Sequence, residues 1–173
     1  SVMARYRRLE ADFTTTAVHV VDLARFLLDS DYAQIHFRYL TQEISGQAVT
    51  SYLLDGEMTS GAAVRLSIYP AAGINVERVR VYGADQAFEL AGSNGLDAPG
   101  WLRRYHENRL AEEISGAQLA GSEESFIING FYAEDEAFFE AVQAGRQPRA
   151  DLAAARQSVA VMQAMRAREQ QYK

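Results

Sequence analysis

The sequence predicts an α+β domain: an open, mostly antiparallel sheet with helices on one face. One amphipathic helical segment comes first, a series of period-2 runs follows, and two helical segments close the chain. This order lacks the alternating βαβ units of a nucleotide-binding fold, and neither GxGxxG nor GxxxxGKS/T occurs. Since 173 residues suffice for one core, we expect residues 1–173 to form a single domain.

The first helix is expected to begin at Thr14–Thr16, whose hydroxyls can cap it, and to end near Asp29 and Ser30. Its apolar residues follow the helical spacing: Ala17, Val20, Val21, Ala24, Leu27 and Leu28. A strand over residues 2–8 precedes it. Alternating runs predict further strands over 33–39, 48–54 (ending before Asp55-Gly56), 64–69, 78–82 and 88–90.

The second half predicts less regular structure and then helices. Residues 101–114 fit either strands or an irregular excursion, and 124–128 are expected to form a last edge strand. A helix is expected from Ala133 to Gly145, with Phe138, Phe139 and Val142 on its apolar side. Asp151 should cap a helix reaching Glu169, whose apolar stripe is Leu152, Ala155, Val159, Met162 and Met165. The polar residues 166–173 are expected to fray.

Composition excludes several classes of function. The net charge of −6 argues against a nucleic-acid or anionic-membrane surface, which needs clustered cations. The absence of Cys rules out disulfides, thiolate nucleophiles and Cys-ligated zinc, and fits the cytoplasm. No apolar run reaches the ~18 residues that span a bilayer. The first five residues look like neither a signal peptide nor a natural start, which suggests a piece of a longer protein.

Residues that can carry chemistry gather in the first helix. Thr15, His19 and Asp22 are spaced to project from one side of it. There they can position a hydroxyl-bearing substrate, with His19 exchanging a proton and Asp22 orienting the imidazole. The alternative is structural: His19 bonds a nearby carbonyl and Asp22 is solvated.

The other polar and aromatic candidates lie outside the first helix. Arg5, Arg7 and Arg8 can contact a phosphate or carboxylate, or can line a solvated strand edge. His36 and His106 are expected at the surface, and without HxxxH or HxH spacing we expect no metal site. Tyr69 and Tyr82 fall on the polar sheet face, which therefore suggests an oligomer contact.

Three strings together resemble the Gfo/Idh/MocA family of oxidoreductases. Residues 17–27, AVHVVDLARFL, are similar to the family's GxHxxDxxRxL helix. Residues 79–90, VRVYGADQAFEL, are similar to its strand–Gly–strand segment. Phe138 to Gly145, Pro148 and the helix from Asp151 to Met165 are similar to its closing pair of helices.

The resemblance implies the substrate-side, C-terminal domain of a two-domain enzyme. A Rossmann domain outside this chain would hold NAD or NADP, and hydride would pass between the cofactor and a sugar or polyol. His19 matches the family's catalytic His, and Asp22 matches an orienting Asp one turn later. The usual catalytic Asp stands four residues before the His, where this chain has Thr15.

The predicted function is therefore a substrate-binding and oligomerisation domain of an NAD(P)-dependent oxidoreductase. The predicted site comprises His19 as the catalytic residue and Thr15, Asp22 and Arg7 as substrate contacts. The predicted partners are the substrate, the Rossmann domain and further copies of the chain through the sheet face, but neither nucleic acid nor membrane. A non-catalytic ligand-binding or scaffold domain of the same fold and a standalone assembly domain are the alternatives, and the Thr at position 15 favours the first of them.

Overall fold

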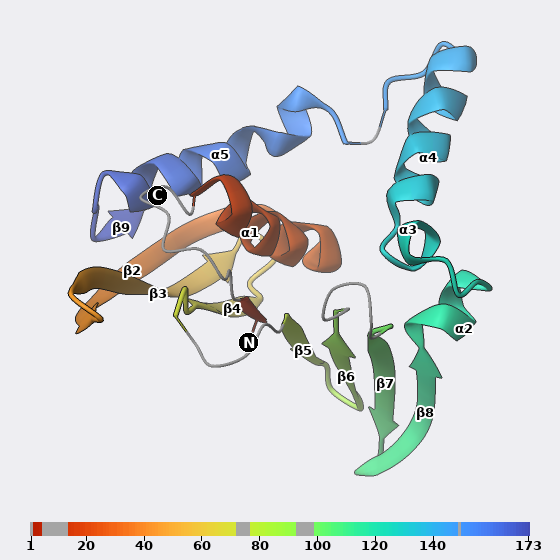
Figure 1. The fold of residues 1–173 in the computed structure, drawn as a ribbon, viewed down its shortest axis with the longest axis horizontal. Coiled ribbons are helices and arrows are strands. Elements are labelled where there is room, and N and C mark those ends of the chain that lie inside the picture. Colours follow the sequence, from red (N-terminus) through yellow and green to blue (C-terminus); the bar gives the residue numbers. More distant parts are fainter. Residues whose placement is uncertain (1, 5–13, 72–76, 93–98, 149) are drawn as a thin grey trace. The chain divides into compact units, whose positions relative to one another are not determined.

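The computed structural model describes residues 2–4, 14–71, 77–92, 99–148 and 150–173 (Figure 1). For residues 2–4 and 14–16 it describes the backbone alone. The chain divides into two compact units, Ser1–Val76 with Ala155–Lys173 and Glu77–Ala154. Whether the two units behave as one domain stays a prediction.

The first unit contains five strands in the order β1-β4-β3-β2-β9. The pairs among β4 (Ala63–Ile68), β3 (Gln47–Met58), β2 (Tyr32–Ile44) and β9 (Gln171–Tyr172) are antiparallel, whereas β1 (Val2–Ala4) runs parallel to β4. The helices α1 (Thr14–Leu28) and α5 (Leu152–Arg166) lie side by side over this part of the sheet (Figure 1). The expected mostly antiparallel sheet with helices is thus confirmed.

The core of this unit lies between the helices and one face of the sheet. Along β2 the side chains of Ile35 and Phe37 are buried while those of His36 and Arg38 are exposed, as expected for a strand with one covered face. The helices meet them with buried Val21, Val161 and Met165. The predicted apolar side of α1 is buried as far as Ala24; Leu27 is 40% exposed.

The second unit is an antiparallel meander followed by three helices. The strands β5 (Arg78–Tyr82), β6 (Gln86–Ala91), β7 (Trp101–His106) and β8 (Arg109–Ser115) pair in sequence order. The stretch 101–114 is therefore a hairpin, whose turn places Glu107 and Asn108 at φ 49° and 59°. The helices are α2 (Gly116–Ala120), α3 (Ser125–Ile128) and α4 (Phe131–Gln143).

The expected edge strand over 124–128 is wrong, because these residues form the helix α3. The amides of Ile127 and Ile128 both donate to the carbonyl of Glu124 at 3.0 Å. The Asn129 side chain donates to the Ser125 carbonyl at 2.8 Å, which closes the turn. Three consecutive apolar residues show neither the alternation of a strand nor the spacing of a helix. Their pattern therefore cannot distinguish a short strand from a single helical turn.

The expected fraying of residues 166–173 is also wrong. The helix α5 ends at Arg166, not at Glu169, and the chain then forms β9 against the edge of β2. The Gln170 carbonyl accepts from the Phe37 amide at 3.0 Å, and the Glu169 carbonyl accepts from the Tyr39 hydroxyl at 2.7 Å. These bonds fix the C-terminal segment to the sheet.

The expected apolar stripes of the last two helices are only partly buried. In α5, Leu152 is 92% and Val159 46% exposed, while the buried side chains are Ser158, Val161, Met162, Ala164 and Met165. In α4, Phe138, Phe139 and Val142 are all at least half exposed. Periodicity located both helices, and Asp151 does cap α5 by accepting from the Ala154 amide at 2.7 Å.

The end of the strand β3 also differs from the predicted one. The strand β3 continues through Asp55-Gly56 to Met58, and the turn before it is Ser45-Gly46, with φ 53° and 76°. A side chain at Gly56 would stand 3.3 Å from the Gln34 carbonyl oxygen, so the glycine allows β2 and β3 to approach there. No helix of the described residues is both long and apolar enough to cross a membrane.

Candidate functional site

The outward side of α1 carries the candidate site. The side chains of Ala17, Val20 and Val21 point into the core, and His19 and Asp22 lie on the opposite, exposed side of the helix. Thr15 belongs to the first turn of α1, four residues before His19, and its side chain is outside the described structure. Arg7 lies outside the described residues. The structure thus brings His19 and Asp22 to one surface and leaves the positions of Thr15 and Arg7 as predictions.

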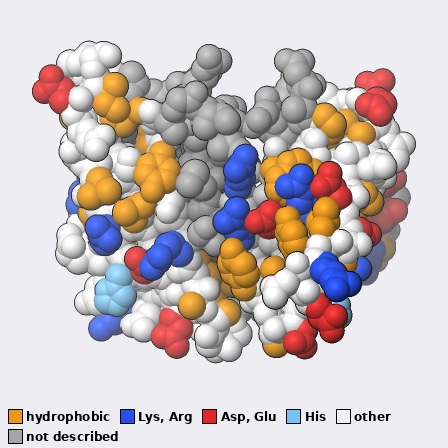
Figure 2. Space-filling model, turned by 90° about the horizontal axis from the view of Figure 1, so that it is seen from below, with side chains coloured by type: hydrophobic (Ala, Val, Ile, Leu, Met, Phe, Trp, Pro, Cys, Tyr) orange, Lys and Arg blue, Asp and Glu red, His pale blue; other side chains and the backbone are white. Residues whose placement is uncertain are grey.

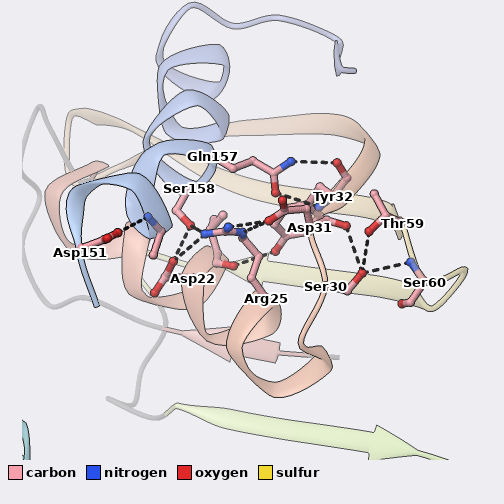
Figure 3. A network of polar contacts seen from close by, with 12 residues as sticks. Asp22, Arg25, Ser30, Asp31, Tyr32, Thr59, Ser60, Asp151, Gln157 and Ser158 are labelled. Atoms are coloured by element: carbon pink, nitrogen blue, oxygen red, sulfur yellow. Dashed lines mark hydrogen bonds and ion pairs between the residues drawn. The ribbon is translucent and has the colours of Figure 1, made fainter. Parts of the chain in front are cut away.

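Asp22 is held by Ser158 on α5 and by Arg25 three residues further along α1 (Figure 3). Its Oδ1 accepts a hydrogen bond from the Ser158 hydroxyl on α5 at 2.6 Å. The Arg25 guanidinium donates to the same oxygen at 3.2 Å and to the Ser158 Oγ at 3.0 Å. Asp22 therefore fastens α1 to α5, a structural role that exists beside any contact with substrate.

Arg25 extends this network to the end of the helix. Its Nε donates to Asp31 Oδ1 at 3.0 Å, so that one guanidinium joins two carboxylates. The Arg25 side chain is only 16% exposed, and Ser158 is 1% exposed. Such a charge needs its partners, because a buried ion without compensation is costly.

Tyr32, the first residue of β2, forms the second part of the anchor. Its hydroxyl donates to the Val21 carbonyl at 2.9 Å, and the Gln157 amide bonds both the amide and the carbonyl of Tyr32, at 2.8 and 2.9 Å. Burial raises the pKa of the Tyr32 phenol well above its ordinary value; Arg25 opposes this shift and Asp22 adds to it. The anchor sets the orientation of α1 and hence the direction in which His19 points.

Spacing in the sequence did not identify these anchoring residues. Ser158 stands 136 positions from Asp22, and Gln157 stands 125 positions from Tyr32. Of these residues, only Arg25 could have been identified from the sequence, because it lies three residues after Asp22 in the string that resembles the family's helix.

The other polar candidates are placed at the surface. His36 is exposed on β2 and His106 is exposed at the end of β7. Arg103 and Arg104 pair across the hairpin with Glu113 and Glu112. Within the described ranges, no group of three or more His, Asp or Glu side chains is arranged to hold a metal ion.

The polar face of the second unit carries an alternating row of charges. Arg80, Glu89, Arg103 and Glu113 stand opposite one another across the four strands, and Arg80 Nε meets Glu89 Oε1 at 2.8 Å. Figure 2 shows basic and acidic side chains intermixed on the face in view, with hydrophobic ones between them. Such a face suits a partner of mixed charge rather than a polyanion.

An open hollow of about 810 Å³ lies between the two hairpin turns of this unit. Its lining mixes tyrosines with acids and amides: Tyr82, Gly83, Ala84, Asp85, Gln86, Ala87, Glu89, Tyr105, His106, Glu107 and Asn108. Tyr105 donates to Glu89 Oε2 at 3.3 Å, so that this acid already has two partners. No spacing or motif in the sequence indicates this hollow.

Known proteins of similar fold are dehydrogenases about twice as long as this chain. The structure matches a dehydrogenase (MviM) from Clostridium difficile with a TM-score of 0.75, at 12% identity, over 96% of this chain and 53% of that one. It matches UDP-N-acetylglucosamine 3-dehydrogenase GnnA from Acidithiobacillus ferrooxidans with a TM-score of 0.72, at 17% identity, over 98% of this chain and 53% of that one. At these identities the likeness shows the fold, and this chain spans about half the length of each of the two proteins.

A sequence match agrees with the fold, although no protein-family model matches the chain. Inositol 2-dehydrogenase of Burkholderia vietnamiensis (strain G4 / LMG 22486) is 29% identical over 150 residues, which are 84% of this chain and 40% of that protein. Sequence and fold together confirm the resemblance: the chain matches the C-terminal domain of the Gfo/Idh/MocA oxidoreductases. The chain spans less than half the length of this curated relative.

Proposed function

We propose that this chain is the substrate-side domain of an NAD(P)-dependent oxidoreductase acting on a sugar, polyol or related hydroxy compound. The observation that carries the proposal is His19, which matches the family's catalytic His and is exposed on an anchored helix. The names of the similar proteins support the same class of substrate, since they include an inositol dehydrogenase and a nucleotide-sugar dehydrogenase.

The chemistry assigned to this chain is proton transfer and orientation. The cofactor, held mainly by a domain outside the chain, supplies the hydride acceptor. Oxidation of a hydroxyl carbon also releases the hydroxyl proton, which a neutral imidazole at His19 accepts. In the reverse direction the imidazolium returns that proton to the carbonyl oxygen. The Thr15 hydroxyl and Arg7 contribute hydrogen bonds to the substrate, and Asp22 fixes the helix while contributing polar surface beside His19.

The anchoring network matters for this role. General acid–base catalysis requires the imidazole nitrogen within hydrogen-bond reach of the proton that it moves. Because Arg25 and Ser158 hold Asp22, and Tyr32 holds the Val21 carbonyl, the turn that carries His19 is fixed on two sides. Misplacement by even about 1 Å can cost on the order of a hundredfold in rate.

Substitution of His19 tests the proposal in the full-length protein. We expect His19→Ala to lower kcat/KM by about 10²–10⁴-fold, measured by nicotinamide absorbance over a panel of sugars and polyols. His36→Ala is the matched control, because His36 is also exposed but lies on β2, and it should stay within about twofold. Turnover by His19→Ala within about twofold of the parent would show that the assigned role is wrong.

The second candidate is a non-catalytic ligand-binding or assembly domain of the same fold. The Thr at position 15 favours it, because a hydroxyl cannot serve as the carboxylate base found at that place in the family. A bound hydroxy compound without any change in nicotinamide absorbance would support this candidate. We further propose cytoplasmic location and association of copies through the polar sheet face, where Tyr82 is 70% exposed.

A further inference from the structure

The helix α4 carries an apolar stripe that the other described residues of its own unit leave exposed. Phe131, Phe138, Phe139 and Val142 recur at i, i+7, i+8 and i+11, and so share one side of the helix. With Tyr132 they are 61, 50, 59, 54 and 52% exposed. Among the thirteen residues of α4, only Ala141 is buried. An amphipathic helix normally packs its apolar side against another part of the protein, and the described residues of this unit leave that side of α4 uncovered.

The rings in the stripe stabilise one another only in part. Phe138 and Phe139 meet edge to face with centroids 5.6 Å apart. Full burial of each aromatic side chain would stabilise the protein, and about half of that surface is exposed. Contiguous exposed apolar surface of this kind marks an interaction site.

The unit that contains α4 also lacks a core of its own. Among its described residues, only Val79, Ala91 and Ala141 are buried hydrophobic side chains. A segment of this length stabilises itself poorly with so few buried groups, because the burial of apolar surface must offset the conformational entropy lost on folding. The cover over α4 is therefore a requirement for stability as well as a contact.

The charge on α4 indicates the chemistry of the cover. Asp135 lies on the same side of the helix as the stripe, whereas Glu134, Glu136 and Glu140 lie around it, and the helix contains no Lys or Arg. The complementary surface therefore combines apolar side chains with basic ones. The remaining half of the similar chains supplies a candidate, because this chain spans only 53% of the two dehydrogenases that it matches.

We propose that the α4 stripe is the docking surface for the dinucleotide-binding domain that accompanies this chain in the full-length protein. The inference rests on the two-domain organisation of the proposed function. It adds a named contact far along the sequence from the His19 helix: α4 would hold the cofactor domain against this chain through Phe131, Phe138, Phe139 and Val142.

Introduced cysteines test the contact, because this chain contains none of its own. In the full-length protein, with other cysteines replaced, Phe139→Cys places a thiol within the stripe and Glu140→Cys places one about 100° around the helix, off the stripe. We expect the thiol at position 139 to react with a maleimide at least about tenfold more slowly, because a site in a packed interface reacts only after local opening. A benzophenone attached there should then cross-link to residues that precede this chain in the same polypeptide.

Each outcome decides the proposal. Slow labelling at position 139 with cross-links to the preceding domain supports it. Equal labelling at both positions, cross-links within this chain, or cross-links to a second copy overturn it. The measurement needs neither substrate nor cofactor turnover. A protein with the cross-links and no dehydrogenase activity would therefore overturn the proposed function and keep the docking surface, and the reverse result would do the opposite.

Discussion

At the scale of single residues, one arginine connects most of the polar anchor. Arg25 is 16% exposed and bonds Asp22, Asp31 and the Ser158 hydroxyl, whereas Arg65 on β4 bonds Asp55 and is 71% exposed. Both side chains form ion pairs, but only the Arg25 side chain is largely shielded from water, while its partners Asp22 and Asp31 are 54% and 55% exposed. Burial, and not the number of ion pairs, should decide what each contributes.

Replacement of each arginine by methionine tests this difference. Arg25→Met keeps much of the apolar stem but removes the cation that bonds Asp22 and Asp31 and the donor to Ser158 Oγ, so we expect a loss of about 1.5–3 kcal/mol in unfolding free energy. Arg65→Met should cost at most about 1 kcal/mol, as for an exposed pair. Urea unfolding measures both losses, and equal losses would contradict the burial argument.

Tyr32 makes stability depend on alkaline pH. Burial holds the phenol pKa above the ordinary 10.0 in the folded state, so above that pH the unfolded chain releases a proton that the folded chain keeps. The contribution is therefore complete below about pH 10 and is lost as pH rises beyond it, by up to about 1.4 kcal/mol per pH unit. Burial also raises the pKa of Tyr39, which adds to the slope.

Tyr32→Phe isolates this contribution. At neutral pH the variant loses the bond to the Val21 carbonyl and should be about 0.5–1.5 kcal/mol less stable than the parent. Above about pH 10 the difference should shrink, because the variant has no phenol to deprotonate at that position. Unfolding free energy measured from about pH 8 to about pH 11 gives the two slopes. Tyr82→Phe, at a tyrosine that is 70% exposed, is the control, and parallel slopes for Tyr32→Phe and the parent would contradict the assignment.

At the scale of elements, the C-terminal strand replaces the frayed end that the sequence predicts. The strand β9 has two residues, too few for any alternation to show, and its stability comes from the edge of β2. Arg168 adds a contact from the preceding turn, with its guanidinium 4.9 Å from the Tyr39 ring centroid and its Nη2 3.0 Å from Thr50 Oγ1.

Truncation of the chain tests the role of β9. A chain that ends at Glu169 loses the Gln170 carbonyl that accepts from Phe37 and the pairing of Gln171 and Tyr172 with β2. We expect an unfolding free energy lower by about 1–3 kcal/mol and faster hydrogen exchange at the Phe37 amide. A chain that ends at Tyr172 is the control and should behave as the parent. Unchanged exchange at Phe37 after the longer truncation would restore the prediction of a frayed end.

Elements long enough to show several repeats of the helical or strand spacing were predictable from the sequence, and shorter elements were not. The helix α1 and the strands β2, β4, β5 and β6 have enough residues for their spacing to indicate their type. The single-turn helix α3 does not, and the stripes of α4 and α5 show that periodicity finds a helix without telling what covers it. The same limit applies to the site: spacing joined His19 with Asp22, but the partners of Asp22 depend on tertiary contacts across 136 positions.

At the scale of the whole molecule, the two units differ in how much apolar surface they bury. Nearly all of the buried hydrophobic side chains in the described residues belong to the first unit, including Ile35, Leu54, Leu66, Ile68 and Met165, each at most 1% exposed. Among its described residues, the second unit buries three hydrophobic side chains and exposes the stripe of α4. Because hydrophobic burial is the main favourable contribution to folding, this difference predicts unequal stabilities for the two units.

The chain's only tryptophan makes this inequality measurable. Trp101 lies on β7 in the second unit, with the Arg103 guanidinium 4.2 Å from its ring centroid, so its fluorescence reports that unit. In this chain we expect the fluorescence transition in urea to precede the loss of amide protection along β2 and β3, because the less buried unit opens first. In the full-length protein, a partner that covers α4 would stabilise the second unit and bring the two transitions together. Coincident transitions in this chain would mean that the two units unfold as one cooperative structure, and would favour the single domain that the sequence predicts.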